Sequence, residues 1–260
     1  MKKRHLVSFL MAGVTLLLGG LAQASLVGFS QQPDMVAGTD ALSMHRAYGP
    51  VVVDDFIVSQ PEITGFRWWG SYFGAAGQSR GQARDVQFEL SLHTDCLAGA
   101  PISPPCPGDP RAGNAAYSYS TPGQPYQFQI LNAQETYFGT TAAGEDVYEY
   151  FVLLTTGWAA TPGAIGWVDI AWAAGQFGTV ADDSIWGWHE SDQHTLDWAV
   201  QTDSAANSQL PLGGNSHLGP WDQLQGKDMA FEVITVPEPG TLALAGLVLC
   251  LLVKTRRGRA

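Results

Sequence analysis

Acidic pairs and one histidine-containing segment are the residues whose types and spacing could support chemistry. Asp54-Asp55 and Asp182-Asp183 are adjacent carboxylates, and residues 188–194 place two histidines next to two more carboxylates. Two carboxyl groups that flank a glycosidic bond can hydrolyse it. Adjacent residues of a strand point to opposite faces, however, so neither pair can supply an acid and a nucleophile to one site. We expect these acidic pairs to be solvated residues of strand edges or turns.

His189 and His194 are the best candidates for metal ligands. Their spacing matches no common closed zinc site. Calcium on Asp182, Asp183, Glu190 or Asp192 is an alternative, because acidic loops supply the oxygen ligands that calcium prefers. We favour a third interpretation, a polar turn between two tryptophan-bearing strands. We therefore expect no cofactor, although calcium stays open as an alternative. We also expect no enzymatic activity, because the sequence contains no nucleophile–base motif.

The chain contains 9 tryptophans, and several occur in pairs. Exposed tryptophan rings stack on sugars, so Trp68, Trp69, Trp186 and Trp188 could form a glycan-stacking platform. Because neighbours on a strand alternate, Trp68 and Trp69 should not both face one core. The alternative is that most tryptophans belong to the core, where this residue is usually largely buried.

Cysteine usage fits an oxidising destination. Cys96 and Cys106 bracket a proline-rich loop, which a disulfide between them would close in an exported protein. Two free thiols are the alternative. Cys250 lies in an apolar segment near the C-terminus and is not counted with them.

Alternation of apolar and polar residues organises the middle of the chain into strands. Val86, Phe88, Leu90 and Leu92 alternate with polar residues, which is the period of a strand with one wet face. The same reasoning predicts strands over 51–58, 63–69, 85–93, 126–130, 147–156, 165–172, 195–202 and 229–233.

No window between residues 25 and 236 sustains a helical period. About nine short strands separated by turn signals predict an all-β fold, an antiparallel β-sandwich of jelly-roll type. The expected organisation is an N-terminal leader over 1–24, a β-sandwich domain over 25–236, and a C-terminal segment with a transmembrane helix and a basic tail over 237–260.

The charge distribution limits the partners. Seven of the 13 basic residues lie in the two ends of the chain, which leaves six against all 24 acidic residues and a net charge of −18 outside the ends, compared with −11 for the whole chain. Such a surface repels nucleic acid and anionic lipid. We therefore expect no nucleic-acid partner.

The N-terminus has the three parts of a secretory leader. Lys2, Lys3 and Arg4 precede an apolar stretch over 6–21, and a small-residue site follows at 22–24. This order is typical of a signal peptide cleaved between Ala24 and Ser25. A signal anchor that stays in the membrane is the alternative.

The C-terminus carries a second export signal. Pro237-Glu238-Pro239 cannot form a helix, the apolar run over 240–253 is shorter than the ~20 residues that span a bilayer comfortably, and four cations follow it. Basic residues directly after an apolar run place the tail in the cytoplasm and the rest of the chain outside. An uncleaved tail anchor is one interpretation of this pattern.

This arrangement resembles the PEP-CTERM sorting signal of exosortase substrates in Gram-negative bacteria. The matching residues are 236–241, the apolar run and the end Arg256-Arg257-Gly258-Arg259. The resemblance implies recognition by a membrane protease-transferase, removal of the helix, and release or attachment at the cell surface. Residues 53–58 with 68–72 also resemble an uncharacterised module of secreted bacterial proteins, which implies no activity.

The sequence thus predicts an exported, surface-sorted protein that passes through an inner-membrane-tethered precursor. We expect a non-catalytic structural or adhesive component of the cell envelope or extracellular matrix, with an exosortase-type enzyme as processing partner. An exopolysaccharide-binding module is the first alternative, and a glycoside-processing enzyme is the second.

Overall fold

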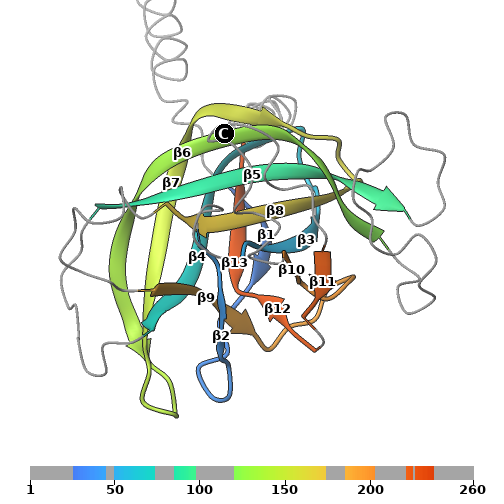
Figure 1. The fold of residues 1–260 in the computed structure, drawn as a ribbon. Coiled ribbons are helices and arrows are strands. Elements are labelled where there is room, and N and C mark those ends of the chain that lie inside the picture. Colours follow the sequence, from blue (N-terminus) through green and yellow to red (C-terminus); the bar gives the residue numbers. More distant parts are fainter. Residues whose placement is uncertain are drawn as a thin grey trace, which may run out of the picture. The chain divides into compact units, whose positions relative to one another are not determined.

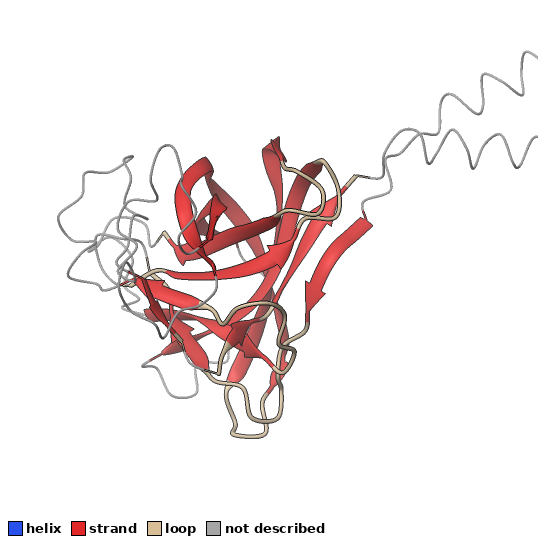
Figure 2. Ribbon diagram, turned by 90° about the vertical axis from the view of Figure 1, so that its right-hand side faces the viewer, coloured by secondary structure: helices blue, strands red, loops and turns tan. Residues whose placement is uncertain are grey.

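A computed structural model describes residues 26–44, 50–73, 85–97, 120–173, 185–202, 221–224 and 226–236. All regular structure in these ranges is β-strand, as Figure 2 shows. Residues Val27–Thr235 form one compact unit. Within the described ranges, no helix is long and apolar enough to cross a membrane. The expected all-β fold is therefore confirmed, while the leader and the C-terminal apolar run lie outside the described residues.

Thirteen strands are labelled in Figure 1. Their bounds are β1 (Leu26–Gln31), β2 (Asp40–Leu42), β3 (Val52–Ile57), β4 (Glu62–Phe73), β5 (Asp85–Leu97), β6 (Ser120–Thr140), β7 (Asp146–Ala159), β8 (Ile165–Trp172), β9 (Ile185–Ser191), β10 (Val200–Thr202), β11 (Trp221–Gln223), β12 (Asp228–Met229) and β13 (Phe231–Thr235).

The antiparallel pairings are nested about the β5–β6 hairpin. Strand β5 pairs with β6, β4 with β7, β3 with β8, and β2 with β9. Pairing of β9 with β4 and of β5 with β8 completes two rows, a first row β2-β9-β4-β7 and a second row β3-β8-β5-β6. This is the order that two Greek keys produce in a jelly roll. The rows join where β6 pairs with β7, so the sheet is continuous and curled.

Glycines occupy the turns on either side of β7. Gly144 has φ of 91° in the turn between β6 and β7, and Gly163 has φ of 81° in the turn between β7 and β8. Glycine adopts these positive angles without the steric cost that a side chain would add. The first turn therefore sets the register that returns β7 along β6. The second turn leads from β7 into β8, which pairs with β3 and β5 and not with β7.

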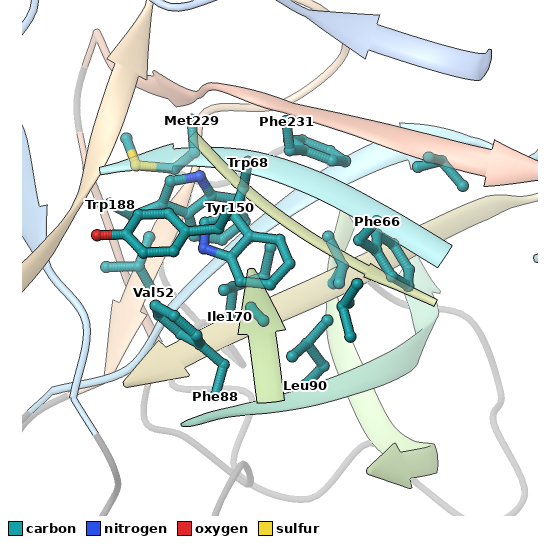
Figure 3. Packing of buried hydrophobic residues seen from close by; sticks show 14 of the residues in the cluster. Val52, Phe66, Trp68, Phe88, Leu90, Tyr150, Ile170, Trp188, Met229 and Phe231 are labelled. Carbon is teal, nitrogen blue, oxygen red and sulfur yellow. The ribbon is translucent and has the colours of Figure 1, made fainter. Parts of the chain in front are cut away.

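Aromatic side chains fill the space between the two rows. Phe88 of the second row contacts Trp68, Tyr150 and Trp186 of the first row, with ring centroids 4.9, 5.0 and 4.9 Å away. All four side chains are fully buried. Figure 3 shows Phe88 and Tyr150 within the cluster that also includes Trp188 and Ile170. The inward positions of both rows thus share one core, as in packed sandwiches.

Most expected strands are present, but the strand predicted over 195–202 is absent over most of its length. Residues 195–199 are not a strand, and only Val200–Thr202 pairs, as β10. Leu196 has φ of 68°, a left-handed conformation that interrupts extended backbone. The expected strand over 126–130 is the central part of the much longer β6, and the expected strand over 229–233 is divided between β12 and β13. The alternation analysis missed β1, β2, β9 and β11.

Truncation of Phe88 should test the packing of the second row against the first. Phe88→Ala removes one ring from three aromatic contacts and leaves a cavity, so we expect a loss of about 3 to 5 kcal/mol in the free energy of unfolding. Urea unfolding followed by tryptophan fluorescence would measure it. The control is Phe128→Ala, at a side chain that is 41% exposed, which should change stability by no more than about 0.5 kcal/mol. Equal losses in the two variants would contradict the assigned core.

Candidate functional site

The four tryptophans expected to stack on glycans are all buried. Trp68, Trp186 and Trp188 point into the core between the rows, and each is 0% exposed. The indole nitrogen of Trp188 also donates to the backbone oxygen of Ala230 at 2.9 Å. None of these rings presents a face to solvent, so the expectation of a stacking platform is corrected.

Trp69 is buried on the opposite face of β4. It is 2% exposed and packs with Val147 and Ala230, with Met35 alongside. Its ring also meets that of Phe138 edge-on at 5.7 Å. Alternation does separate Trp68 from Trp69, as expected, but both faces of β4 are covered here, so neither ring lies at the surface.

The Asp54-Asp55 pair is buried as well, which corrects the expectation of a solvated pair. Both residues are 0% exposed. As expected for neighbours on a strand, they have different partners: Asp54 Oδ2 accepts a 2.7 Å hydrogen bond from the amide of Met229, and Asp55 Oδ2 accepts one of 3.3 Å from the amide of Asp197. Each carboxyl group therefore holds a different segment against β3.

Asp228 completes a cluster of buried carboxyl groups. Its Oδ2 lies 2.7 Å from His194 Nδ1 and accepts a hydrogen bond from the amide of Thr195 at 2.9 Å. Asp228 and Asp55 thus bind the non-strand segment that contains Leu196 from both ends. One oxygen of each, Asp228 Oδ1 and Asp55 Oδ1, has no hydrogen-bond partner in the described part of the chain.

Burial and mutual repulsion raise the pKa of these acids. Desolvation raises the pKa of Asp55 to about 9, with repulsion from Asp197 and Asp228 adding to it. Desolvation and the neighbouring charges of Asp228 and Asp55 raise the pKa of Asp54 well above its usual value. The pKa of Asp228 is also raised, chiefly by burial. With a pKa of about 9, Asp55 is a neutral group at neutral pH and can donate a hydrogen bond.

A serine, a histidine and an aspartate meet on the outer face of the second row. Ser91 Oγ lies 2.8 Å from His93 Nε2, and that nitrogen lies 2.9 Å from Asp169 Oδ2. The Ser91 hydroxyl also donates to the same aspartate oxygen. In a nucleophilic triad the histidine uses one ring nitrogen for the serine and the other for the carboxylate. Here one nitrogen meets both partners, and all three residues are 0% exposed.

Sequence reasoning missed this cluster, although part of its signal was present. Ser91 and His93 share one face of a strand that the alternation analysis had predicted. Asp169 joins them through the antiparallel register that sets it opposite Ser91. A single sequence does not give that register.

The two histidines proposed as metal ligands have separate partners. His189 Nδ1 lies 2.8 Å from Asp40 Oδ1, and its Nε2 lies 3.0 Å from the backbone oxygen of Asp34. Burial lowers the pKa of His189, but the hydrogen bond and charge of Asp40 outweigh it, so the pKa is raised overall. His194 instead stacks on Trp198 with ring centroids 3.7 Å apart.

Of the four carboxylates considered as calcium ligands, Glu190 links separate segments of the fold. Glu190 accepts from the amide and hydroxyl of Thr39 and pairs with Lys227 at 3.0 Å, while Asp192 is exposed. Asp182 and Asp183 lie outside the described residues. Among the residues that the structure describes, no three His, Cys, Asp or Glu side chains are grouped to hold a metal ion.

Other expected sites lie wholly or partly beyond the described ranges. Residues 24–25 and 237–239 are outside them, and so is Cys106. Cys96 lies in β5 opposite Thr121. The disulfide and the two processing sites therefore stay predictions.

The point where the chain leaves the domain is well described. Strand β13 ends at Thr235, and only Val236 separates it from Pro237. β13 lies between β1 and β4 in the sheet. The residues that precede the C-terminal signal are thus part of the sheet and not a linker.

The raised pKa values predict that stability falls as pH rises. A carboxyl group whose folded pKa lies above its unfolded pKa keeps its proton only in the folded protein over that interval. The contribution of Asp55 to stability is therefore full below its unfolded pKa of about 4 and is lost as the pH rises to about 9. Asp55 alone contributes a slope of up to about 1.4 kcal/mol per pH unit. Chemical unfolding at pH 5, 7 and 9 would measure this dependence.

Asp55→Asn should flatten that dependence, because the amide cannot ionise. The exposed Asp192→Asn is the matched control and should keep the wild-type slope. The raised pKa of His189 contributes in the same direction, so a residual slope is expected in both variants. Identical pH profiles for the two variants would rule out the assigned role of Asp55.

Comparison with known proteins supplies the family. A family model described as "Domain of unknown function (DUF7901)" matches residues 27–234, and a PEP-CTERM protein-sorting motif matches residues 235–257. No curated protein and no solved structure matches the chain. The two matches meet at the end of β13. The chain therefore belongs to the DUF7901 domain family and carries a C-terminal PEP-CTERM sorting motif, which makes it an exosortase substrate that is exported and sorted to the envelope or beyond.

Proposed function

We propose that the domain is a non-catalytic structural or adhesive component of the cell envelope or extracellular matrix. The observation that supports this is the use of its reactive side chains. Ser91, His93 and Asp169 are bonded to one another inside the protein, and Asp54 and Asp55 hold backbone amides. These groups stabilise the fold in places where solvent does not reach them.

A neutral outer face along β6 is the surface we assign to contact. Along β6 the outward residues 128, 130, 132, 134 and 136 are exposed, and none of them carries a charge. On β7 the neighbouring Leu153 is 58% exposed. A neutral face on a protein with strong net negative charge avoids repelling an acidic matrix polymer or another copy of the protein.

Binding of exopolysaccharide is the second candidate, and the same face favours it. Phe128 and Ile130 lie in line with Asn132 and Gln134 on β6. Apolar side chains can contact the faces of sugar rings while amides bond to hydroxyl groups. This surface replaces the buried tryptophans as the candidate contact with glycan.

We further propose that the precursor is held in the inner membrane by the apolar run over 240–253 until it is processed. The position of the sorting motif directly after β13 supports this, because the domain would remain close to the membrane. Cleavage would then release the domain or transfer it to the cell surface.

Deletion of the gene in the native host should weaken the matrix or surface attachment, and the full-length chain should restore it. Complementation with Phe128→Ala/Ile130→Ala should fail, while Gln193→Ala, at an exposed residue outside β6, serves as control. Retention of purified protein by the host's polysaccharide, in the presence of calcium, would favour the glycan candidate if the first double variant abolished it. Release of new reducing ends from that polysaccharide would contradict a non-catalytic role.

Replacement of Pro237-Glu238-Pro239 by three alanines should block maturation. We expect intact mass from the membrane fraction to include the apolar run and Arg259, while the wild-type protein ends close to Pro237. Unchanged mature mass and location in the variant would contradict processing at this motif.

A further inference from the structure

The last strand of the domain is enclosed on both sides. β13 is five residues long and pairs with β4 in antiparallel register, from Phe231 opposite Trp68 to Thr235 opposite Ile63. Its other neighbour is β1, the first strand of the domain. The strand that precedes the sorting motif is therefore covered by the strand that follows the expected leader.

On the outer face, Glu232 of β13 links all three strands. Its Oε2 lies 2.6 Å from Arg67 Nη1 of β4. Its Oε1 accepts hydrogen bonds from Ser30 Oγ of β1 at 3.2 Å and from Gln32 Nε2, just after β1, at 2.9 Å. Such charge-assisted hydrogen bonds are stronger than neutral ones. One carboxylate thus holds β1 and β4 on either side of β13.

On the inner face, aromatic rings also join β1 to β13. The ring of Phe29 lies 5.1 Å from that of Phe231 and 5.8 Å from that of Phe56. Gly28 brings β1 very close to the end of β13, since a Cβ at that position would lie 2.7 Å from Thr235 Cγ2. The absence of a side chain at Gly28 is required for this approach.

These contacts also fix the direction of β1. Gly28 lies against Thr235, whereas Ser30 lies against Glu232, so residue numbers rise along β1 as they fall along β13. The two strands are therefore antiparallel. The start of β1 at Leu26 and the end of β13 at Thr235 therefore lie at the same end of this strand pair.

We propose that β1 is a clasp on β13: the segment released by leader cleavage closes over the final strand and confines C-terminal processing to the residues beyond Thr235. Without β1, β13 would be an edge strand held only by β4, and edge strands at chain ends open readily. Proteases cut where backbone opens. This inference depends on the sorting motif and is independent of the adhesive role proposed above.

The first test removes only the outer contacts of the clasp. In the full-length protein, Ser30→Ala/Gln32→Ala deletes two hydrogen bonds to Glu232 and leaves the Arg67 ion pair in place. We expect amide hydrogen exchange of β1 and β13 to accelerate about tenfold, as two lost hydrogen bonds would predict, with β7 unchanged. The matched control, Gln134→Ala/Thr136→Ala on β6, should exchange like the wild type at β1 and β13. Wild-type exchange of β13 in the clasp variant would overturn the proposal.

The second test blocks the docking of β1 and measures processing. Gly28→Val places a branched side chain against Thr235 and Ser59, while the control Gly139→Val faces only the end of Met35, with a Cβ distance of 3.3 Å. Intact mass of protein from the native host should show C-termini shortened into residues 231–235 for Gly28→Val alone. The same mature C-terminus in both variants would refute the clasp. If Gly28→Val does not accumulate, the exchange experiment on the alanine variant decides.

Discussion

The contact of Phe88 with three aromatic rings of the opposite row is the interaction on which the rest of the structure depends. Jelly-roll pairing brings distant segments side by side, but hydrogen bonds along a row do not attach one row to the other. Phe88 makes that attachment at the centre, against Trp68, Tyr150 and Trp186. Large rings also bury much apolar area for each residue ordered. The burial of six of the nine tryptophans is consistent with this use of large rings.

Buried carboxyl groups have a comparable role where the chain is not a strand. The segment over 195–199 lacks ladder partners for much of its backbone, and an unpaired buried amide is costly. Asp55 and Asp228 accept hydrogen bonds from the amides of Asp197 and Thr195. The cost of desolvating these acids is reduced when they take up a proton. A strongly acidic protein thus uses some of its carboxyl groups as internal supports.

Alternation was a sound guide for β8, although it missed β9, which lies between β2 and β4. The pattern over residues 165–172 predicted β8 with the bounds that the structure has. It failed at Leu196, because Leu196, Trp198 and Val200 also alternate in a segment that is held by side chains and turns at a positive φ. Alternation gives no information about what covers the second face of a strand, so the burial of Trp69 and Asp55 was not foreseen.

The position of the chain ends was beyond prediction for a related reason. β1 and β13 are separated by almost the whole domain in sequence, and their pairing is a property of the complete sheet. The C-terminal signal, by contrast, is local and linear, so its residues could be recognised directly. Local chemistry was thus readable from one sequence, and long-range register was not.

The enclosed position of β13 has a mechanical consequence. A pull on the chain beyond Thr235 acts along a strand that has hydrogen-bonded neighbours on both sides. Such a pull loads the hydrogen bonds of β13 to β1 and to β4 in shear at the same time, together with the ion pair of Arg67 and Glu232. An edge strand, by contrast, could be peeled away one hydrogen bond at a time. A domain anchored through this end would transmit tension into the centre of its sheet before it began to unravel.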